Sequence, residues 1–433
     1  MASGIASVEY WRDVKPILDR RCAVCHGCYD APCQLNLSAF EGIARGAHKK
    51  KVYDTTRLIS AEPTRLFEDA NSVAEWRQKG FFPVLSEQSQ PAGDDTSQAG
   101  VLARMLALKQ KHPLPSVTPL PETFDFSLDR TQQCPTEAQF DNFAGEYPLW
   151  GMPYGLPGLT EREHDTLLRW IEEGAPYQEP DPLPPSYGER IREWEAFLND
   201  DAPKPRLMSR YLYEHLYLAN LYFDDLDGRP SRQYFRLVRS RTAPGRPIDR
   251  IATRLPYDDP GSDNVYYRLQ PMRASVLAKT HIPYALSQAR KERYTELFLD
   301  APYEVRAMPT YDPAVASNPF LVFRDLPVLS RYRFLLDDAN LFLMMFIKGP
   351  SCRGPVALDV IDDRFWIFFV DPDSAVLDHL TEFLAKESKH LWLPTEEGSS
   401  RLGLVSWLKY SSLQQEFLKA KQAYLENLRA NDE

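Results

Sequence analysis

The first hydrophobic pattern along the chain is helical. Residues 8–22, VEYWRDVKPILDRRC, place Trp11, Val14, Leu18 and Cys22 at three- and four-residue spacing. This spacing puts the four side chains on one face of a helix. The sequence therefore predicts a helix that ends at a cysteine.

A second amphipathic helix is predicted within residues 151–176. Thr160 and Glu163 have the spacing of a capping box, and leucine, tryptophan and isoleucine side chains follow on one apolar face. Gly174 is predicted to end this helix, because glycine commonly follows the last helical turn.

The pattern weakens between these two helices. Polar and proline-bearing segments such as KQKHPLPSVTPLPET dominate residues 34–145. Helices are expected there only near residues 62–76 and 100–109. We interpret residues 34–145 as a long, mostly irregular insertion.

The second half of the chain mixes helix and strand. Residues 177–189, YQEPDPLPPSYGE, are typical of a stiff linker, so a domain boundary is expected near residue 180. An aromatic-rich helix is predicted at 208–223 and a terminal helix at 404–428. The predicted strands are QYFRLVRSRT (233–242), YEVRAMPTY (303–311) and RFWIFFVDP (364–372).

These elements predict two domains. Residues 1–178 form a mainly α-helical domain that carries the insertion, and residues 189–433 form an α+β domain. A chain of 433 residues with 43% hydrophobic side chains is long enough for two buried cores.

Composition and charge argue against a nucleic-acid partner and against a membrane-spanning segment. With 61 acidic and 51 basic side chains the net charge is -10, so no nucleic-acid partner is expected. The longest apolar runs, LFLMMFI (341–347) and FWIFFV (365–370), are shorter than the roughly 20 residues that a membrane span needs. They predict core strands or short helices rather than a transmembrane segment. Residues 1–11, MASGIASVEYW, have neither the basic nor the apolar stretch of an export signal, so none is expected there.

Four of the six cysteines lie in RCAVCHGCYDAPCQ, residues 21–34, and three chemistries use such clusters. If the cysteines were iron–sulfur ligands, their C-x2-C-x2-C-x4-C spacing would differ from the bacterial ferredoxin motif, whose last gap is three residues. As zinc ligands they would all come from one short segment, whereas short zinc sites usually split into two pairs. The third chemistry is covalent haem attachment.

Residues 22–26, CAVCH, have the C-x-x-C-H signature of haem attachment. Two thioether bonds would anchor the porphyrin, and the adjacent histidine would lie under the iron. The amphipathic helix before the motif and the GMP turn before the second helix strengthen this interpretation, so we favour haem over zinc or iron–sulfur.

The pairing of these two segments resembles class I cytochromes c, in which a methionine in the loop before the last helix closes the haem's other side. Met152 is the matching position, although methionines commonly just fill core space. The resemblance implies a cytochrome c-like fold for residues 1–178, with a haem pocket rebuilt by the insertion. It implies Cys22, Cys25, His26 and Met152 as haem-binding residues, the last two as metal ligands.

The remaining cysteines raise the question of a disulfide. With haem on the first two, Cys28 and Cys33 are close enough to form a short disulfide, which would persist where haem is attached covalently. The alternatives are two reduced thiols, or pairing of either with Cys134. We favour the Cys28–Cys33 bond.

Longer motifs carry a second resemblance. MSRYLYEHLYLANLYF, YFRLVRSRTAPGRPIDRIATRLPYDDPG, VLSRYRFLLDDANLFLMMFIKGPSCRGPVALDVIDDRFWIFFVDPD and CAVCHGCYDAPCQLNL together resemble the bacterial fatty acid cis/trans isomerases. The resemblance implies a periplasmic isomerase with one covalent haem c. Its substrates would be unsaturated acyl chains or phospholipid at the membrane surface, converted from cis to trans under solvent or heat stress. His26 and Met152 would be the catalytic residues.

The resemblance also sets limits. Family members are expected to begin with a hydrophobic segment and to continue beyond Glu433, so we expect an incomplete second domain and reduced activity. Cys352 and Arg353, in KGPSCRG, lie in a family-like motif whose role stays open. His215 and its neighbouring tyrosines could line a lipid path, and core packing is their commoner role.

Rotation about a carbon–carbon double bond requires a weakened π bond, and no acid, base or nucleophile in the sequence obviously provides that. The resemblance implies that ferric haem iron draws electron density from the alkene and returns it, with no net redox. An apolar groove is expected beside the haem. The alternative function is that of a periplasmic c-type cytochrome, an electron-transfer or redox partner, which a small haem edge ringed by charge would favour.

Overall fold

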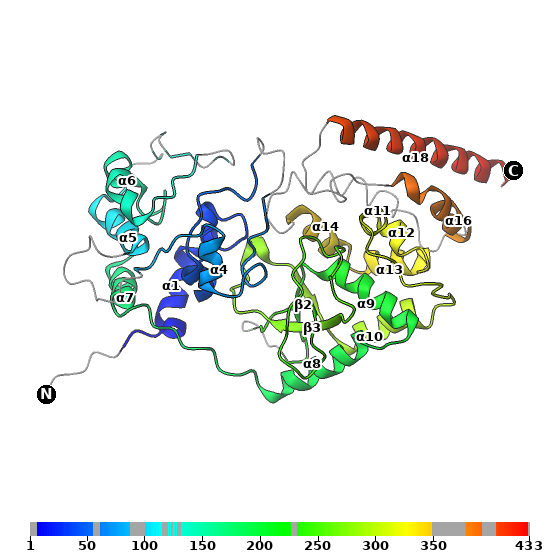
Figure 1. Ribbon diagram of the computed structural model, residues 1–433, viewed down its shortest axis with the longest axis horizontal. Helices are drawn as coiled ribbons and strands as arrows, with labels where there is room; N and C mark the ends of the chain where they lie inside the picture. The colour runs from blue at the N-terminus through cyan, green and yellow to red at the C-terminus, as the bar shows by residue number, and fades with distance from the viewer. Residues whose placement is uncertain are drawn as a thin grey trace. The chain divides into compact units, whose positions relative to one another are not determined.

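The computed structural model of the 433-residue chain describes residues 7–54, 61–86, 100–114, 120, 122, 124–125, 127, 131–226, 232–348, 377–391 and 404–431. The chain divides into two compact units, whose elements are labelled in Figure 1. Unit 1 comprises Met1–Tyr53, Thr64–Pro182 and Arg273–Thr280. Unit 2 comprises Asp54–Pro63, Leu183–Met272 and His281–Glu433.

Unit 1 consists of short helices joined by irregular segments. Its described elements are η1 (Tyr10–Val14), α1 (Lys15–Arg21), α2 (Ala23–His26), η2 (Pro32–Gln34), α3 (Phe40–Arg45), α4 (Val73–Gln78), α5 (Val101–Lys111), η4 (Glu137–Gln139), α6 (Phe140–Glu146), η5 (Pro148–Trp150), α7 (Glu161–Glu172) and η6 (Ala278–Thr280). Its largest hydrophobic cluster joins the first helices to α5 and α7 through Val14, Leu18, Leu106, Leu167 and Trp170.

The helix predicted at 8–22 is present as η1 followed by α1. Val14 and Leu18 are buried as predicted, whereas Trp11 is 36% exposed and its indole donates to the Gln178 carbonyl oxygen at 2.9 Å. The prediction was wrong at Trp11 because η1 is a π-helical turn, which changes the angular spacing of side chains along the first turn.

The second predicted helix is α7, with the predicted caps at both ends. The Thr160 hydroxyl accepts from the Glu163 N–H at 3.3 Å, and the Glu163 carboxylate accepts from the Thr160 N–H at 3.1 Å. Gly174, at φ 85°, follows the helix in the left-handed conformation that glycine tolerates. Leu167 and Trp170 are buried against the core.

Within the insertion, the helix expected at 100–109 is α5, but 62–76 forms only α4 at its end. Ser72 caps α4 by accepting from the Glu75 N–H, and the chain before it is irregular, with Phe67 at φ 68°. The side-chain cap therefore fixes where α4 begins.

Unit 2 is built on a four-stranded mixed sheet in the order β3-β2-β1-β4. β2 (Phe235–Ser240) pairs antiparallel with β1 (Asn220–Tyr222) and β3 (Tyr266–Pro271), while β1 pairs parallel with β4 (Pro283–Ala285). This small sheet among helices is an α+β arrangement, as predicted. The described helices are α8 (Pro185–Leu198), α9 (Pro203–Leu216), α10 (Gln288–Tyr294), η7 (Thr295–Leu299), α11 (Pro313–Ala316), α12 (Pro319–Val322), α13 (Val328–Asp337), α14 (Ala339–Lys348), α16 (Leu377–Glu387), η9 (Ser388–His390) and α18 (Leu404–Asn431).

Two predictions for unit 2 were wrong in part or in full. The helix predicted at 208–223 ends at Leu216, because the Asn220 N–H donates to the Ile282 carbonyl oxygen and the chain enters the sheet. The strand predicted at 303–311 is irregular, because none of the described strands pairs with it, although Tyr303, Val305 and Met308 pack partly buried against the core. The strand predicted at 364–372 lies outside the described residues.

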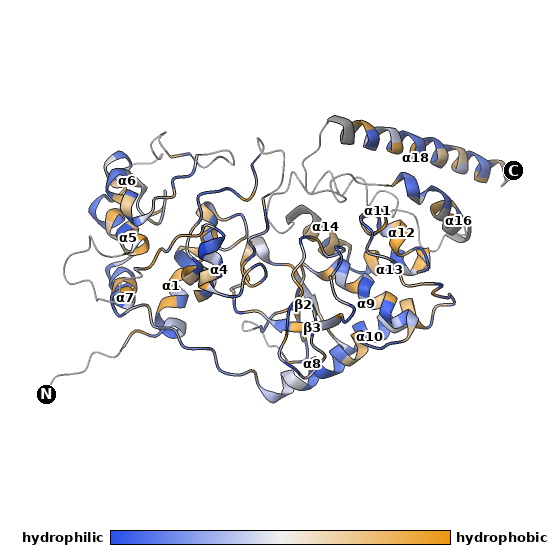
Figure 2. Ribbon diagram, in the orientation of Figure 1, coloured by the Kyte–Doolittle hydropathy of each residue, from blue (hydrophilic) through white to orange (hydrophobic). Residues whose placement is uncertain are grey.

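Other predictions for unit 2 are confirmed. The strand predicted at 233–242 is β2, and the whole of LFLMMFI lies in the short helix α14. The predicted terminal helix is α18, which alternates between hydrophilic and hydrophobic residues in Figure 2. None of the helices in the described ranges combines the length and the apolar character that a membrane crossing requires.

Candidate functional site

The predicted haem-attachment residues lie on consecutive turns at the start of unit 1. The Cys22 N–H donates to the Leu18 carbonyl oxygen at 2.9 Å and closes the last turn of α1. Cys25 and His26 follow on α2. Cys22 is half-buried, Cys25 is exposed, and neither belongs to a disulfide.

The His26 ring is buried, with 8% of the residue exposed. Its Nδ1 lies 3.1 Å from the Leu35 carbonyl oxygen. A carbonyl oxygen can only accept, so in the neutral ring the proton belongs on Nδ1 and the lone pair on Nε2. Metal-binding histidines are usually oriented by such a bond from the other ring nitrogen. The Leu37 N–H also donates to the His26 carbonyl oxygen at 2.6 Å, so one segment holds both ring and backbone.

The Cys22 thiol is poorly suited to thiolate chemistry. Burial raises its pKa to about 12, and the positive charge of Arg21 offsets only part of this rise. Nucleophilic attack by a cysteine uses the thiolate form. At neutral pH an unmodified Cys22 is therefore a protonated thiol.

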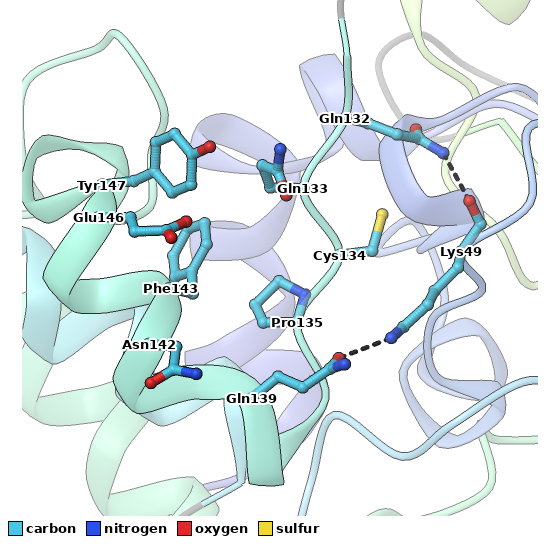
Figure 3. Close-up of a pocket in the computed structure, with 10 residues that line it drawn as sticks. All are labelled: Lys49, Gln132, Gln133, Cys134, Pro135, Gln139, Asn142, Phe143, Glu146 and Tyr147. Carbon is cyan, nitrogen blue, oxygen red and sulfur yellow. Dashed lines mark hydrogen bonds between the residues drawn. The ribbon is translucent and has the colours of Figure 1, made fainter.

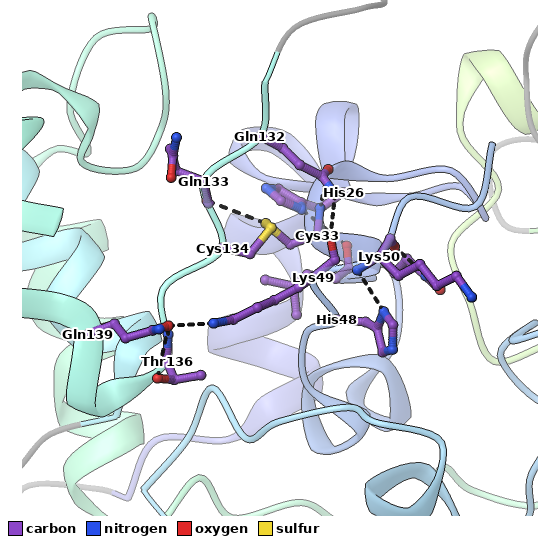
Figure 4. The surroundings of a disulfide bond; sticks show 12 residues. His26, Cys33, His48, Lys49, Lys50, Gln132, Gln133, Cys134, Thr136 and Gln139 are labelled. Atoms are coloured by element: carbon purple, nitrogen blue, oxygen red, sulfur yellow. Dashed lines mark hydrogen bonds between the residues drawn. A yellow bond between two sulfur atoms is a disulfide. The ribbon is translucent and has the colours of Figure 1, made fainter. Parts of the chain in front are cut away.

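The disulfide of the site joins Cys33 to Cys134, so the prediction of a Cys28–Cys33 bond was wrong (Figure 4). Cys33 has a φ of 54° within a short turn, and its N–H donates to the Gln132 side chain at 3.0 Å. That turn places Cys33 against the segment that carries Cys134. Because Cys33 is oxidised, it cannot be the fourth thiolate of an iron–sulfur or zinc cluster.

Within the described ranges, no group of three or more histidine, cysteine, aspartate or glutamate side chains is arranged to hold a metal ion. His26 thus offers a single oriented nitrogen ligand for a metal. A metal bound there would have to bring most of its other ligands with it, as iron in a porphyrin does.

Met152 is half-buried in the turn before α7. It packs against the cluster that Cys22 also borders, and against a second cluster formed by α5 and α6. Its N–H donates to the Met105 carbonyl oxygen at 3.0 Å. These apolar contacts also suit a core methionine, so the ligand role of Met152 stays a prediction.

The Met152 turn lies against the C-terminal part of α5. A Cβ at Gly151 would overlap the Lys109 backbone, so only glycine permits this approach. The Lys109 side chain is buried, with 2% of the residue exposed, and its Nζ has no hydrogen-bond partner among the described residues. Burial lowers the Lys109 pKa to about 8.

A segment distant in sequence also packs at this site. Arg273–Thr280 follows β3 but belongs to unit 1. The Ser275 hydroxyl donates to Asp19 at 2.9 Å and contacts the buried Lys15 ammonium. A Cβ at Gly27, directly after His26, would overlap the Leu277 side chain. Sequence reasoning missed this segment, because no local pattern links it to α1.

A pocket of about 390 Å³ lies beside the disulfide (Figure 3). The Lys49 ammonium donates to the Gln139 side chain at 2.6 Å, and the Gln132 amide donates to the Lys49 carbonyl oxygen. Most lining side chains are polar, so this pocket lacks the character expected of an acyl groove. It is lined by Lys49, Gln132, Gln133, Cys134, Pro135, Gln139, Asn142, Phe143, Glu146 and Tyr147.

The family model for fatty acid cis/trans isomerase matches residues 61–433, most of the chain. The chain belongs to the fatty acid cis/trans isomerase family. As a member it is an isomerase whose substrates are fatty acids. No curated protein and no solved structure matches the chain. The cytochrome c-like fold of residues 1–178 therefore stays a prediction.

The isomerase family match bears unequally on the predicted site. It includes Met152 but begins after Cys22, Cys25 and His26, so it does not test the attachment motif. The second family-like motif, with Cys352, lies outside the described residues.

Inside the matched region, the tyrosines considered for a lipid path are mainly core residues. Tyr211 and Tyr213 are 2% and 8% exposed within the large cluster of unit 2. His215 is half-buried, with its Nδ1 2.7 Å from the Tyr211 carbonyl oxygen and its ring centroid 4.0 Å from that of Tyr211, tilted by 39°. These contacts favour the packing role for the two tyrosines.

Proposed function

We propose that this isomerase carries one haem c, bound covalently through Cys22 and Cys25, and uses it to convert cis double bonds of membrane-lipid acyl chains to trans without net redox. The observation that carries the proposal is the buried His26 ring, held through Nδ1 by the Leu35 carbonyl oxygen beside two cysteines outside the disulfide. Two thiols and one oriented imidazole are the set that haem c attachment requires.

A second observation supports the fit of this group. Lys109 is a buried cation whose Nζ has no partner among the described residues, and it lies against the Met152 turn. An isolated buried charge is costly. A haem carries two propionate carboxylates, so it would bring a counter-charge to this part of unit 1.

In the proposed reaction, bound haem iron supplies a centre that accepts electron density from the alkene during rotation and returns it. His26 keeps its imidazole in one orientation because Leu35 fixes the ring, and Leu277 covers the backbone at Gly27 from solvent. Met152 would be the second residue to hold the haem iron.

The proposal includes a periplasmic location at the membrane surface. The Cys33–Cys134 disulfide supports this part, because disulfides persist in oxidising compartments and are rare in the cytosol. The phospholipid-bound acyl chain as substrate extends the fatty-acid activity of the family.

The test is isomerisation by the full chain produced with the machinery for covalent haem attachment. We expect one haem that survives denaturation, and trans acyl chains formed from cis lipid without ATP or nicotinamide, measured by gas chromatography. His26→Ala should lose this activity, whereas His112→Ala, at a half-buried histidine after α5, should retain it. Hydrogen exchange of unit 2 should be the same in both variants.

Two results would contradict the proposal. One is trans-acyl production by a haem-free chain, and the other is unchanged production by a well-folded His26→Ala variant. A haem-bearing chain that exchanged electrons with a partner but never altered a double bond would favour the electron-transfer alternative.

A further inference from the structure

Six arginines are buried in the described part of the chain, and five of them have clear acceptors. In unit 2, Arg210 pairs with Glu214 at 2.8 Å, and Arg268 pairs with Glu195 at 2.8 Å. Arg239 donates to the Asp258 carbonyl oxygen and the Thr253 hydroxyl. In unit 1, Arg45 and Arg104 donate hydrogen bonds to backbone carbonyl oxygens, and Arg104 also donates to one carboxylate.

Arg331, on α13, is the exception. It is 5% exposed, its Nε is sealed from solvent, and its side chain has no hydrogen-bond or ion-pair partner among the described residues. Burial lowers the pKa of Arg331, an effect that the Tyr211 hydroxyl opposes. A guanidinium nevertheless stays charged in proteins. A buried charge without a counter-ion is costly, which indicates that an anion completes this site.

The surroundings of Arg331 are aromatic. Phe334 lies one turn along on the same face of α13. Its ring centroid is 5.2 Å from Tyr211 and 5.9 Å from His215, both on α9, and 5.0 Å from Phe342 on α14. Arg331 therefore lies one turn from a residue of an aromatic cluster contributed by α9, α13 and α14, and its charge interacts with Tyr211 of that cluster.

We propose that Arg331 binds the anionic oxygen headgroup of an acyl substrate. A guanidinium donates two parallel hydrogen bonds to a carboxylate or a phosphate. The headgroup has two possible sources, the carboxylate of a free fatty acid and the phosphate of a lipid. The inference rests on the proposed function for its substrate class but not for its haem.

The test is equilibrium binding to the full chain, below the concentration at which each ligand forms micelles. The probes are oleate, its uncharged ester methyl oleate, and oleoyl lysophosphatidate, which carries a phosphate. We expect the parent chain to bind at least one anionic probe about tenfold or more tightly than methyl oleate, because hydrogen bonds to a buried charge are strong. Preference for oleate identifies a free acid, and preference for lysophosphatidate identifies a lipid phosphate.

Variants assign the effect to Arg331. Arg331→Met should remove the preference for the anionic probe and leave methyl oleate binding unchanged, and Arg331→Lys should keep part of it. Arg324→Met, at an exposed arginine, is the matched control and should bind as the parent does. If hydrogen exchange shows that Arg331→Met does not fold, the lysine variant and the parent's own probe preference decide.

The proposal is overturned if the parent chain binds all three probes equally, or if a folded Arg331→Met keeps the full preference. His26→Ala should keep the parent's preference. Failure of the haem mechanism would thus appear as unchanged isomerisation by a folded His26→Ala variant, while failure of this site would appear in the binding measurements alone.

Discussion

Unit 1 and unit 2 gather their hydrophobic residues in different ways. Unit 2 collects side chains from its sheet and most of its helices into one large cluster, in which Phe298, Phe323 and Tyr332 have no exposed surface. The described part of unit 1 instead has three smaller clusters, one of them formed only by Ala70, Trp76 and Phe81. Irregular segments run between them.

The two units therefore draw their stability from different sources. Small cores leave less of the chain's surface buried, so a domain built from them depends more on covalent links, caps and polar contacts. The His26 segment is held in this way, by a carbonyl oxygen and a nearby disulfide. The proposed chemistry thus lies in the unit whose structure depends least on a single core.

The largest expected effect is the loss of the disulfide. Replacing Cys33 and Cys134 together by serine opens a loop with a sequence separation of 101 residues. A cross-link over a loop of this size stabilises by about 4–5 kcal/mol on the chain-entropy account. Hydrogen exchange resolved by unit should show unit 1 destabilised and unit 2 unchanged.

Cys28→Ser is the matched control for this experiment and should leave the stability of unit 1 within about 0.5 kcal/mol of the parent. An equal loss of protection in both units would show that the disulfide supports the whole chain, and the contrast between the units would fail.

The next largest effect is expected in the core of unit 2. Phe298 has no exposed surface and packs against Tyr211 and Phe334, with ring centroids 5.4 and 5.8 Å away. Phe298→Ala should therefore destabilise unit 2 by about 3–4 kcal/mol, as is typical of large core truncations. Leu408→Ala, at a leucine that is 58% exposed, should change little. Urea denaturation followed by far-ultraviolet circular dichroism measures both, and equal effects of the two variants would contradict the assignment of this core.

A third prediction concerns pH and unit 1. Burial lowers the Lys109 pKa from 10.5 to about 8 in the folded chain. Between these values the unfolded chain binds more protons, so the contribution of Lys109 to stability becomes more favourable as pH rises, by on the order of 2–3 kcal/mol. Lys109→Met should remove this rise, and Lys111→Met, at an exposed lysine, should keep it. Urea denaturation at pH 7.5 and pH 10 checks the difference, and identical pH dependence in both variants would contradict it.

The sequence predicted a helix correctly where a periodic hydrophobic pattern was flanked by residues that cap both of its ends. Thr160, Glu163 and Gly174 mark both ends of α7, and its predicted burial is confirmed at Leu167 and Trp170. At 208–223 a continuous aromatic run concealed the change from α9 to β1, because a short strand within it carries no separate period.

The site was predictable only in part for a related reason. The C-x-x-C-H spacing is local, so Cys22, Cys25 and His26 could be identified from sequence as candidates. The bond from His26 to a backbone carbonyl oxygen has no side-chain signal. Likewise, sequence spacing favoured Cys28 over Cys134 as the partner of Cys33, because chain proximity is visible in a sequence and spatial proximity is not.

The smallest predicted effect tests whether unit 1 depends on local caps. In α7 the Thr160 hydroxyl accepts from the Glu163 N–H, and the Glu163 carboxylate returns the bond. Thr160→Ala should cost about 1 kcal/mol, because it leaves a helix-terminal N–H without its side-chain acceptor. Thr160→Ser keeps the hydroxyl and should restore most of the loss. Hydrogen exchange of the first turn of α7 measures both variants. Trp170 anchors this helix in the main cluster of unit 1. A loss of protection confined to the first turn would therefore mean that the core, and not the cap, sets the stability of unit 1.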